Sequence, residues 1–150
     1  MDYPSAAELS ACPFLHGMEW RHLESMAACA LRAHFDEGEF IFNTGEPANR
    51  FYLLTSGRVV LESERDDGTH FIVQTIEAGD VLGWSWLFPP FQWRFTARAV
   101  EPVDAIFFHG IRLRETAEQN PEFGCDILRR VSNVLLSRLQ STRNQLAHSR

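Results

Sequence analysis

Apolar residues in the first thirty positions recur at three- and four-residue steps, the spacing that marks one face of an α-helix. The sequence therefore predicts helical structure over residues 6–33, and Pro13 and Gly17 break it into short pieces. The apolar positions of this region are Leu9, Phe14, Leu15, Met18, Leu23, Met26, Ala27, Ala30 and Leu31.

The apolar spacing changes to two residues from about His34, which indicates β-strands. Short strand-like runs occupy residues 40–42, 51–54, 59–61, 71–73, 95–99 and 105–108. Turn-forming residues separate them, at 36–38, 43–47, 56–57 and 66–68. Asp67-Gly68 is the strongest of these signals and predicts a hairpin between the strands on either side of it.

The helical spacing returns at Ile111. Asn120-Pro121 marks a helix start, because proline fits the first turn, where its missing N–H group costs no hydrogen bond. One stripe then continues at three- and four-residue steps through Leu128, Val131, Leu135, Leu139, Thr142 and Leu146, broadened by Ile127 and Val134. A helix over residues 121–146 would be about 39 Å long, more than one small roll covers. We expect its C-terminal half to pair with a second copy of the chain; the alternative is a helix folded back on its own domain.

This order of elements predicts a mainly β protein with flanking helices. We expect an antiparallel β-roll, that is a double-stranded β-helix or jelly roll, with N-terminal helices and a long C-terminal helix. Residues 1–112 would form the N-terminal helices and the roll, and residues 113–150 the C-terminal dimerisation helix. A length of 150 residues suits one domain, and an apolar content of 45% is ample for a packed core.

The net charge of −6 argues against a general nucleic-acid binder. The charge is uneven, because no acidic residue follows Asp126. The basic residues beyond that point are Arg129, Arg130, Arg138, Arg143 and Arg150. We interpret them as a solvated helix face that complements the negative C-terminal end of the helix dipole.

Other classes of protein are disfavoured by simple patterns. No apolar run is long enough to span a bilayer, so no membrane association is expected. Cys12, Cys29 and Cys125 are odd in number and far apart, which favours reduced thiols in a cytoplasmic protein. The paired cysteine spacings of zinc and iron–sulfur sites do not occur, so no metal is expected.

Two segments resemble a known family. The stretch from Gly45 to Gly57, with Glu46 and Tyr52 inside it, is similar to the Gly-Glu and Tyr-Gly signature of the cyclic nucleotide-binding domain of Crp/Fnr regulators. Residues 79–83, Gly-Asp-Val-Leu-Gly, resemble the approach to that family's phosphate-binding cassette, and residues 138–142 resemble its dimerisation helix. The resemblance covers about residues 14–146. In that family a helix-turn-helix domain follows; here the chain ends at Arg150, so direct sequence-specific DNA binding is not expected.

The resemblance implies a ligand site, and two of its positions depart from the family. A family Glu that holds the ribose corresponds to Trp84, which offers an N–H donor and no carboxylate. The family's phosphate Arg lies five residues before an Arg-Ala pair, and counting back from Arg98 reaches Trp93, so Arg94 is one residue out of register. The candidate ligand-binding residues are Leu82, Gly83, Trp84, Ser85, Trp93, Arg94, Phe95, Thr96 and Thr142.

An unusual number of aromatic residues surrounds this segment: Trp84, Trp86, Trp93, Phe88, Phe91 and Phe95. They would pack the core, line a pocket for a flatter or less polar ligand, or close the pocket altogether. We expect Trp86 to point inward, and Trp84 and Trp93 to face the pocket.

We therefore favour a non-enzymatic regulatory domain of the cyclic nucleotide-binding type, with atypical or lost cyclic AMP binding. Its ligand would be a cyclic nucleotide (cyclic AMP or cyclic GMP) or another small molecule. It would signal through its C-terminal helix to a regulatory partner protein. The alternative is a pseudo-receptor, a homodimeric interaction module without a ligand. A cupin-like barrel enzyme is weaker, because His34, His70 and His109 are scattered and form no His-x-His pair.

Overall fold

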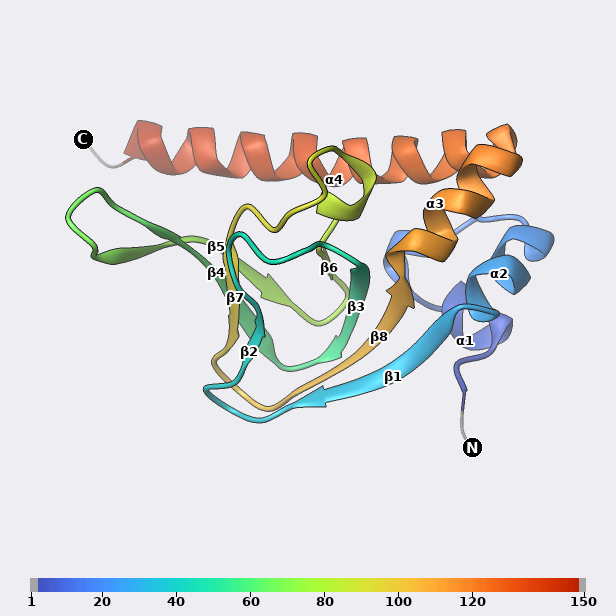
Figure 1. Cartoon of the computed structure of the whole chain (residues 1–150), viewed down its shortest axis with the longest axis horizontal. Helices are drawn as coiled ribbons and strands as arrows, with labels where there is room; N and C mark the ends of the chain where they lie inside the picture. Colours follow the sequence, from blue (N-terminus) through green and yellow to red (C-terminus); the bar gives the residue numbers. More distant parts are fainter. Residues whose placement is uncertain (1–2, 149–150) are drawn as a thin grey trace.

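The computed structural model describes residues 3–148 and contains a β-roll with helices at both ends of the chain (Figure 1). Three short N-terminal helices lie together at one end of the roll. They are α1 (Ala6–Ser10), the 3₁₀ turn η1 (Pro13–Leu15) and α2 (Trp20–Ala27). Pro13 starts η1 and Gly17 lies before α2, so the predicted breaks in this helical region are confirmed.

The roll consists of two four-stranded sheets in which every strand pairing is antiparallel. The first sheet has the order β1-β8-β3-β6, with β1 (Ala30–Phe35), β8 (Val103–His109), β3 (Arg50–Ser56) and β6 (Val81–Leu82). The second has the order β2-β7-β4-β5, with β2 (Phe40–Phe42), β7 (Thr96–Ala99), β4 (Arg58–Glu64) and β5 (His70–Glu77). The predicted fold class is confirmed, and the turn at Asp67-Gly68 joins β4 to β5.

The central strands of the first sheet are apolar on both faces because both faces are covered. On β3, Phe51 belongs to the core beneath the helices, whereas the next residue, Tyr52, belongs to the core between the two sheets. Phe108 and Phe107 divide in the same way on β8. Neighbouring strand residues point to opposite faces, so these continuous apolar runs build two cores at once.

One predicted element is wrong. Residues 30–33 were expected at the end of the N-terminal helical region, but they begin strand β1. Helix α2 ends at Ala27, and β1 pairs with β8 from Ala30 opposite Phe108 to Phe35 opposite Val103. The free edge of β8 offers these residues a ladder of backbone hydrogen bonds, which outweighs the helical preference of alanine and leucine.

Two helices follow the roll: α3 (Gly110–Gln119) and α4 (Pro121–His148). The long C-terminal helix, expected over residues 121–146, is confirmed, and it runs along the whole upper side of the view in Figure 1. Its first half buries Phe123, Ile127 and Val131, and the backbone N–H of Phe123 donates to Asn120 Oδ1 at 3.3 Å. Its second half leaves large apolar side chains exposed. Arg150 lies outside the described residues.

Three further observations complete the fold. Within residues 3–148, no helix combines the length and the apolar character that crossing a membrane requires. Cys12, Cys29 and Cys125 are free thiols. Burial raises the pKa of the Cys12 and Cys29 thiols, so both stay protonated at neutral pH.

Candidate functional site

The candidate site is built on the cassette segment, by which we mean residues 79–99, between β5 and the end of β7. After β6 the chain forms a single 3₁₀ turn, η2 (Ser85–Leu87), which lies beneath the middle of α4 in Figure 1. Trp86 is fully buried in this turn, 5.8 Å from the ring of Phe51, so its predicted inward direction is confirmed. Arg114 of α3 donates to the carbonyl oxygen of Trp86 at 2.7 Å, and this bond ties the turn to the helix.

A cavity of about 250 Å³ lies between the cassette segment, the roll and α4. Its lining is mostly aromatic or aliphatic, with one hydroxyl, from Ser85, and two guanidinium groups, from Arg94 and Arg138. The lining residues are Phe42, Leu61, Gly83, Trp84, Ser85, Phe88, Trp93, Arg94, Phe95, Leu135 and Arg138. None of these residues is acidic, so this lining offers no carboxylate to a sugar hydroxyl.

Trp93 forms a fixed wall of the cavity. Its side chain is 5% exposed, and its ring stacks on Phe42 with 3.8 Å between centroids and 10° between planes. The backbone N–H of Trp93 donates to the carbonyl of Glu46, and the N–H of Gly45 donates to the carbonyl of Trp93, each at 2.9 Å. These two bonds hold the register of Trp93 against the Gly-Glu segment, so an aromatic ring occupies the inward position.

Gly83 allows Trp93 to come this close. Its φ is +88°, in the left-handed region that glycine adopts without strain. A Cβ atom at residue 83 would lie 3.0 Å from Cη2 of Trp93 and 3.2 Å from the carbonyl oxygen of Arg50. The glycine is therefore required both by the backbone conformation and by the packing of the indole.

Arg94 follows Trp93 and points away from the core. It is exposed, and its Nη2 donates to the carbonyl of Pro89 over a long 3.4 Å. The chain bends at residues 94 and 95, before β7 begins at Thr96, and both of these residues are exposed whereas Trp93 is buried. The guanidinium of Arg94 is a weakly held cation at the mouth of the cavity.

Arg138 brings α4 into the site. Its Nη2 donates to the carbonyl of Val81, and its Cζ lies 4.5 Å from the centroid of the Trp84 ring, a cation–π contact. Its Nη1 is buried and has no hydrogen-bond partner among the described residues. Burial lowers the pKa of Arg138 to about 10, partly opposed by the charge of Asp80. The guanidinium therefore remains charged at neutral pH.

The structure brings most of the predicted site residues together. Gly83, Trp84, Ser85, Trp93, Arg94 and Phe95 all line the cavity. Three others do not line it. Leu82 is fully buried between the sheets, Thr96 shares a 3.0 Å hydrogen bond with the Thr44 hydroxyl, and Thr142 lies further along α4.

Sequence reasoning missed four lining residues, Phe42, Leu61, Leu135 and Arg138, and it named Phe88 only as a member of the aromatic cluster. Arg138 was interpreted as part of a solvated helix face, but it is half-buried against the cassette segment. A signal was present, because Arg138 lies three residues after Leu135 and seven after Val131. That spacing places it on the apolar side of the helix.

A larger and more open depression of about 660 Å³ lies between α2 and the start of α4. Its three carboxylates are already paired, since Arg21 bonds to Glu19 and Glu122, and Arg130 bonds to Asp126 at 2.9 Å. Its remaining cation, Arg129, contacts Cys125 Sγ at 3.8 Å. We therefore place the candidate site in the smaller cavity, where the cations have no acidic partner in the lining.

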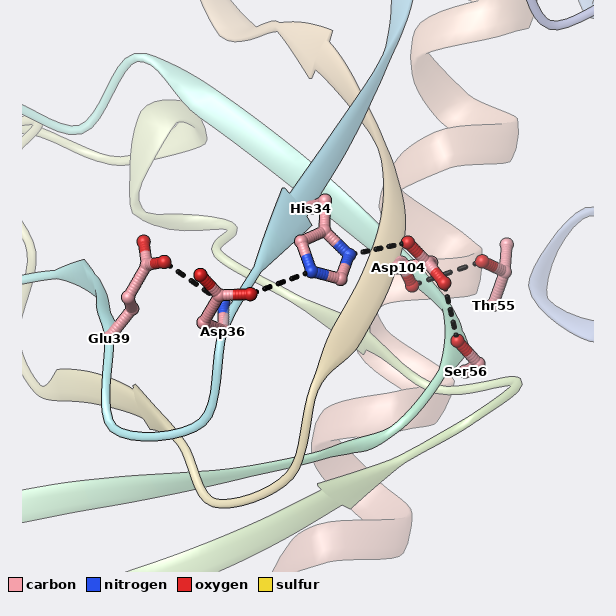
Figure 2. Close-up of polar contacts among 6 residues, drawn as sticks. All are labelled: His34, Asp36, Glu39, Thr55, Ser56 and Asp104. Atoms are coloured by element: carbon pink, nitrogen blue, oxygen red, sulfur yellow. Dashed lines mark hydrogen bonds and ion pairs between the residues drawn. The ribbon is translucent and has the colours of Figure 1, made fainter.

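A separate polar cluster lies on the roll surface (Figure 2). His34 lies between two carboxylates, with Nδ1 2.8 Å from Asp104 and Nε2 3.0 Å from Asp36. Ser56 donates to the other oxygen of Asp104 at 3.1 Å. Asp104, followed by Asp36, raises the pKa of His34, and His34 in turn lowers the pKa of Asp104.

This cluster is not a nucleophile with its base. Ser56 and His34 both bond to Asp104, and no hydrogen bond joins them within residues 3–148 (Figure 2). A general base must reach the hydroxyl that it activates. The same described residues include no group of three or more His, Cys, Asp and Glu side chains placed to hold a metal ion.

Comparison with known proteins agrees with this architecture. The family model of the cyclic nucleotide-binding domain matches residues 32–120, more than half of the chain. A crystal structure from Geobacter metallireducens, of a protein assigned to the cyclic nucleotide-binding proteins, superposes with a TM-score of 0.82 at 28% identity. The alignment covers 93% of this chain and 99% of that one.

Two curated relatives are longer than this chain. The CRP-like cAMP-activated global transcriptional regulator of Mycobacterium tuberculosis is 27% identical over 139 residues, which are 93% of this chain and 60% of the regulator. The acetyltransferase Pat of Mycolicibacterium smegmatis is 34% identical over 98 residues, 65% of this chain and 29% of that protein. The chain thus spans only part of the length of both relatives. The match of the family model to residues 32–120 shows that the chain belongs to the cyclic nucleotide-binding domain family.

Proposed function

We propose that this member of the cyclic nucleotide-binding domain family is a regulatory sensor whose cavity takes a small molecule in an atypical way. Helix α4 would report occupancy of the cavity to a partner. One observation carries the proposal: Trp84, at the position where the family holds the ribose, is in contact with Arg138 of α4. Ligand site and output helix therefore share a side-chain contact.

The cavity is a poor host for cyclic AMP held in the family's manner. A ribose hydroxyl needs an acceptor, and the lining offers the Ser85 hydroxyl but no carboxylate. The cyclic phosphate needs a fixed cation, but Trp93 fills the inward position and Arg94 is exposed and loosely held. Both groups that give the nucleotide its affinity would be held weakly.

Coupling to α4 follows from the contacts of Arg138. A ligand that displaced Trp84 would remove the ring beneath the guanidinium and change the bond to Val81. A helix whose position depends on these contacts would shift between an empty and an occupied state. This is a regulatory role, and we propose no catalytic activity for the chain.

A second copy of the chain is the expected partner of α4. Five leucines of this helix are exposed: Leu128, Leu135, Leu136, Leu139 and Leu146. Most of them follow the heptad spacing that pairs helices in a coiled coil. The same surface supports a second candidate function, a dimeric interaction module in which Arg138 and Trp84 stay in contact and no ligand binds.

Calorimetric titration of the whole chain with cyclic AMP and cyclic GMP tests the proposal. We expect no saturable binding up to about 1 mM, which corresponds to a binding free energy weaker than about −4 kcal/mol. Arg94→Gln is the matched variant. Micromolar cyclic AMP binding in the native chain that is lost in Arg94→Gln would show that the phosphate is held in the usual way, and would contradict an atypical site.

A further inference from the structure

We infer that the cavity beside Trp84 takes a compact organic acid with an apolar body, whose carboxylate pairs with Arg138. The inference rests on the proposed function, because it names the ligand class of the same cavity. It goes beyond the resemblance to the family, since it moves the anion-binding group from the cassette segment to α4.

The first argument is the unmatched positive charge. The cavity lining contains two guanidinium groups and no carboxylate. Asp80 acts on Arg138 through its charge, but its Oδ2 accepts from the backbone N–H of Glu77 at 3.3 Å. The ion pairs of the described residues do not include Arg138. Removing a cation from water without an anionic partner is costly. A ligand carboxylate would supply the anionic partner that Arg138 lacks in the cavity.

The second argument is the geometry of the guanidinium. Nη2 of Arg138 donates to the carbonyl of Val81, and Cζ of Arg138 lies 4.5 Å from the centroid of the Trp84 ring. Nη1 is buried without a hydrogen-bond partner in the part of the chain that the structure describes. A buried donor is normally satisfied, so a ligand oxygen brought within reach of Nη1 would supply the missing acceptor. The guanidinium is held through Nη2 and against Trp84, while both N–H groups of Nη1 are unused.

The third argument is the character of the walls. Seven of the lining side chains are aromatic or aliphatic: Phe42, Leu61, Trp84, Phe88, Trp93, Phe95 and Leu135. A volume of about 250 Å³ is below the usual range of drug-sized pockets, which favours a body of one or two fused rings. A sugar would leave most of its hydroxyls against these walls without partners.

Two probes of the same shape, one charged and one neutral, separate the contribution of the carboxylate charge from that of the apolar ring system. Naphthalene-2-carboxylate and naphthalene-2-carboxamide are titrated into the ¹⁵N-labelled full chain, and the indole N–H signals of Trp84 and Trp93 are followed by NMR. We expect the acid to bind at least about 10-fold more tightly than the amide, because a hydrogen bond to a charged group is worth roughly that factor or more.

Variants of the chain test whether the carboxylate of the probe pairs with Arg138. Arg138→Gln should reduce the affinity for the acid to that for the amide and leave the amide unaffected. Arg143→Gln, a change of an exposed arginine on the same helix, should leave the preference intact. The comparison of acid with amide in the native chain needs no variant and stands even if Arg138→Gln fails to fold.

Three results would overturn the inference. Equal affinity for acid and amide would show that the apolar body alone is recognised, and would leave the sensing role of the cavity standing. A preference for the acid that survives Arg138→Gln would show that the carboxylate pairs with a group other than Arg138. The absence of indole shifts with either probe up to about 10 mM, a free energy weaker than about −3 kcal/mol, would reject this ligand class; the coupling of α4 to Trp84 is tested independently, without a ligand.

Discussion

The guanidinium of Arg138 lies over the ring of Trp84, at the position where the family resemblance implies a glutamate. Trp84 and Trp93 were identifiable from the sequence because the cassette segment resembles a family motif. Arg138 was not, because it lies more than fifty residues further on and looked like one of several surface arginines. Only the packing of α4 against β6 makes it part of the site.

Gly83 offers a test of the close packing around Trp93. Gly83→Ala forces a non-glycine residue into φ +88° and places its Cβ 3.0 Å from the indole. We expect a loss of about 2–3 kcal/mol in unfolding free energy, measured by chemical denaturation. Gly38→Ala is the matched control, because Gly38 has φ +91° but a Cβ added there would meet no described atom within 4 Å.

The control should lose only about 1 kcal/mol, the backbone contribution. Equal losses for the two variants would mean that Trp93 moves away at no cost. In that case the indole would not be the fixed wall that the stacking on Phe42 indicates.

His34 makes stability depend on pH in a predictable direction. The neighbouring carboxylates of Asp104 and Asp36 raise the pKa of His34, so its contribution is fully present below its unfolded value of about 6.5 and is lost as pH rises through its folded value. His34 lowers the pKa of Asp104, whose contribution is lost as pH falls through its own folded value. Both contributions are fully present above the unfolded pKa of Asp104 and below that of His34, so the cluster is most stabilising at about pH 5–6.

We expect His34→Gln to lower the melting temperature more at about pH 5.5 than at about pH 8.5. His70→Gln, at an exposed histidine at the start of β5, serves as the control and should show no such difference. If His34→Gln lowered the melting temperature by the same amount at both pH values, the two carboxylates would not be holding a protonated His34.

The elements differ in how far local sequence determines them. Helix α4 was predictable almost to its ends, because Asn120-Pro121 starts it and its apolar stripe has one period throughout. Strand β1 was not, because its residues also suit a helix and become a strand only by pairing with β8. β6 is two residues long and has no period of its own, so pairing with β3 alone defines it.

The exposed stripe of α4 predicts how the chain associates. Leu139 is 65% exposed, and burying such a side chain is worth about 1.5–3 kcal/mol per copy. We expect Leu139→Glu to weaken self-association on the order of 100-fold or more, measured by sedimentation equilibrium. The native chain should sediment with twice its mass of 17.2 kDa.

Gln140→Glu introduces the same charge at the neighbouring exposed position and should leave the dimer intact. A native chain that remains monomeric at high concentration would contradict the pairing of α4. Equal weakening by both variants would assign the effect to charge and not to the leucine stripe.

Across the whole molecule, α4 joins regions that are distant in sequence. Its first half is held by Arg130, which donates to the carbonyls of Phe14 and His16 at 2.8 Å. Its middle is held at the cassette segment by Arg138, and the helix continues beyond that residue to His148. The helix is therefore held at its start by the N-terminal segment and in its middle by the cassette segment, and the proposed reporting role depends on the second contact.

Hydrogen exchange of α4 in Trp84 variants tests this account most directly, because it needs no knowledge of the ligand. Trp84→Ala removes the ring beneath Arg138, whereas Trp84→Phe keeps an aromatic face there. We predict that backbone amides in residues 132–142 exchange about 10-fold faster in Trp84→Ala than in the native chain, which corresponds to about 1.4 kcal/mol of lost local stability. Trp84→Phe should stay close to the native rate. Unchanged exchange of these residues in both variants would contradict the claim that α4 reads the cavity through Trp84.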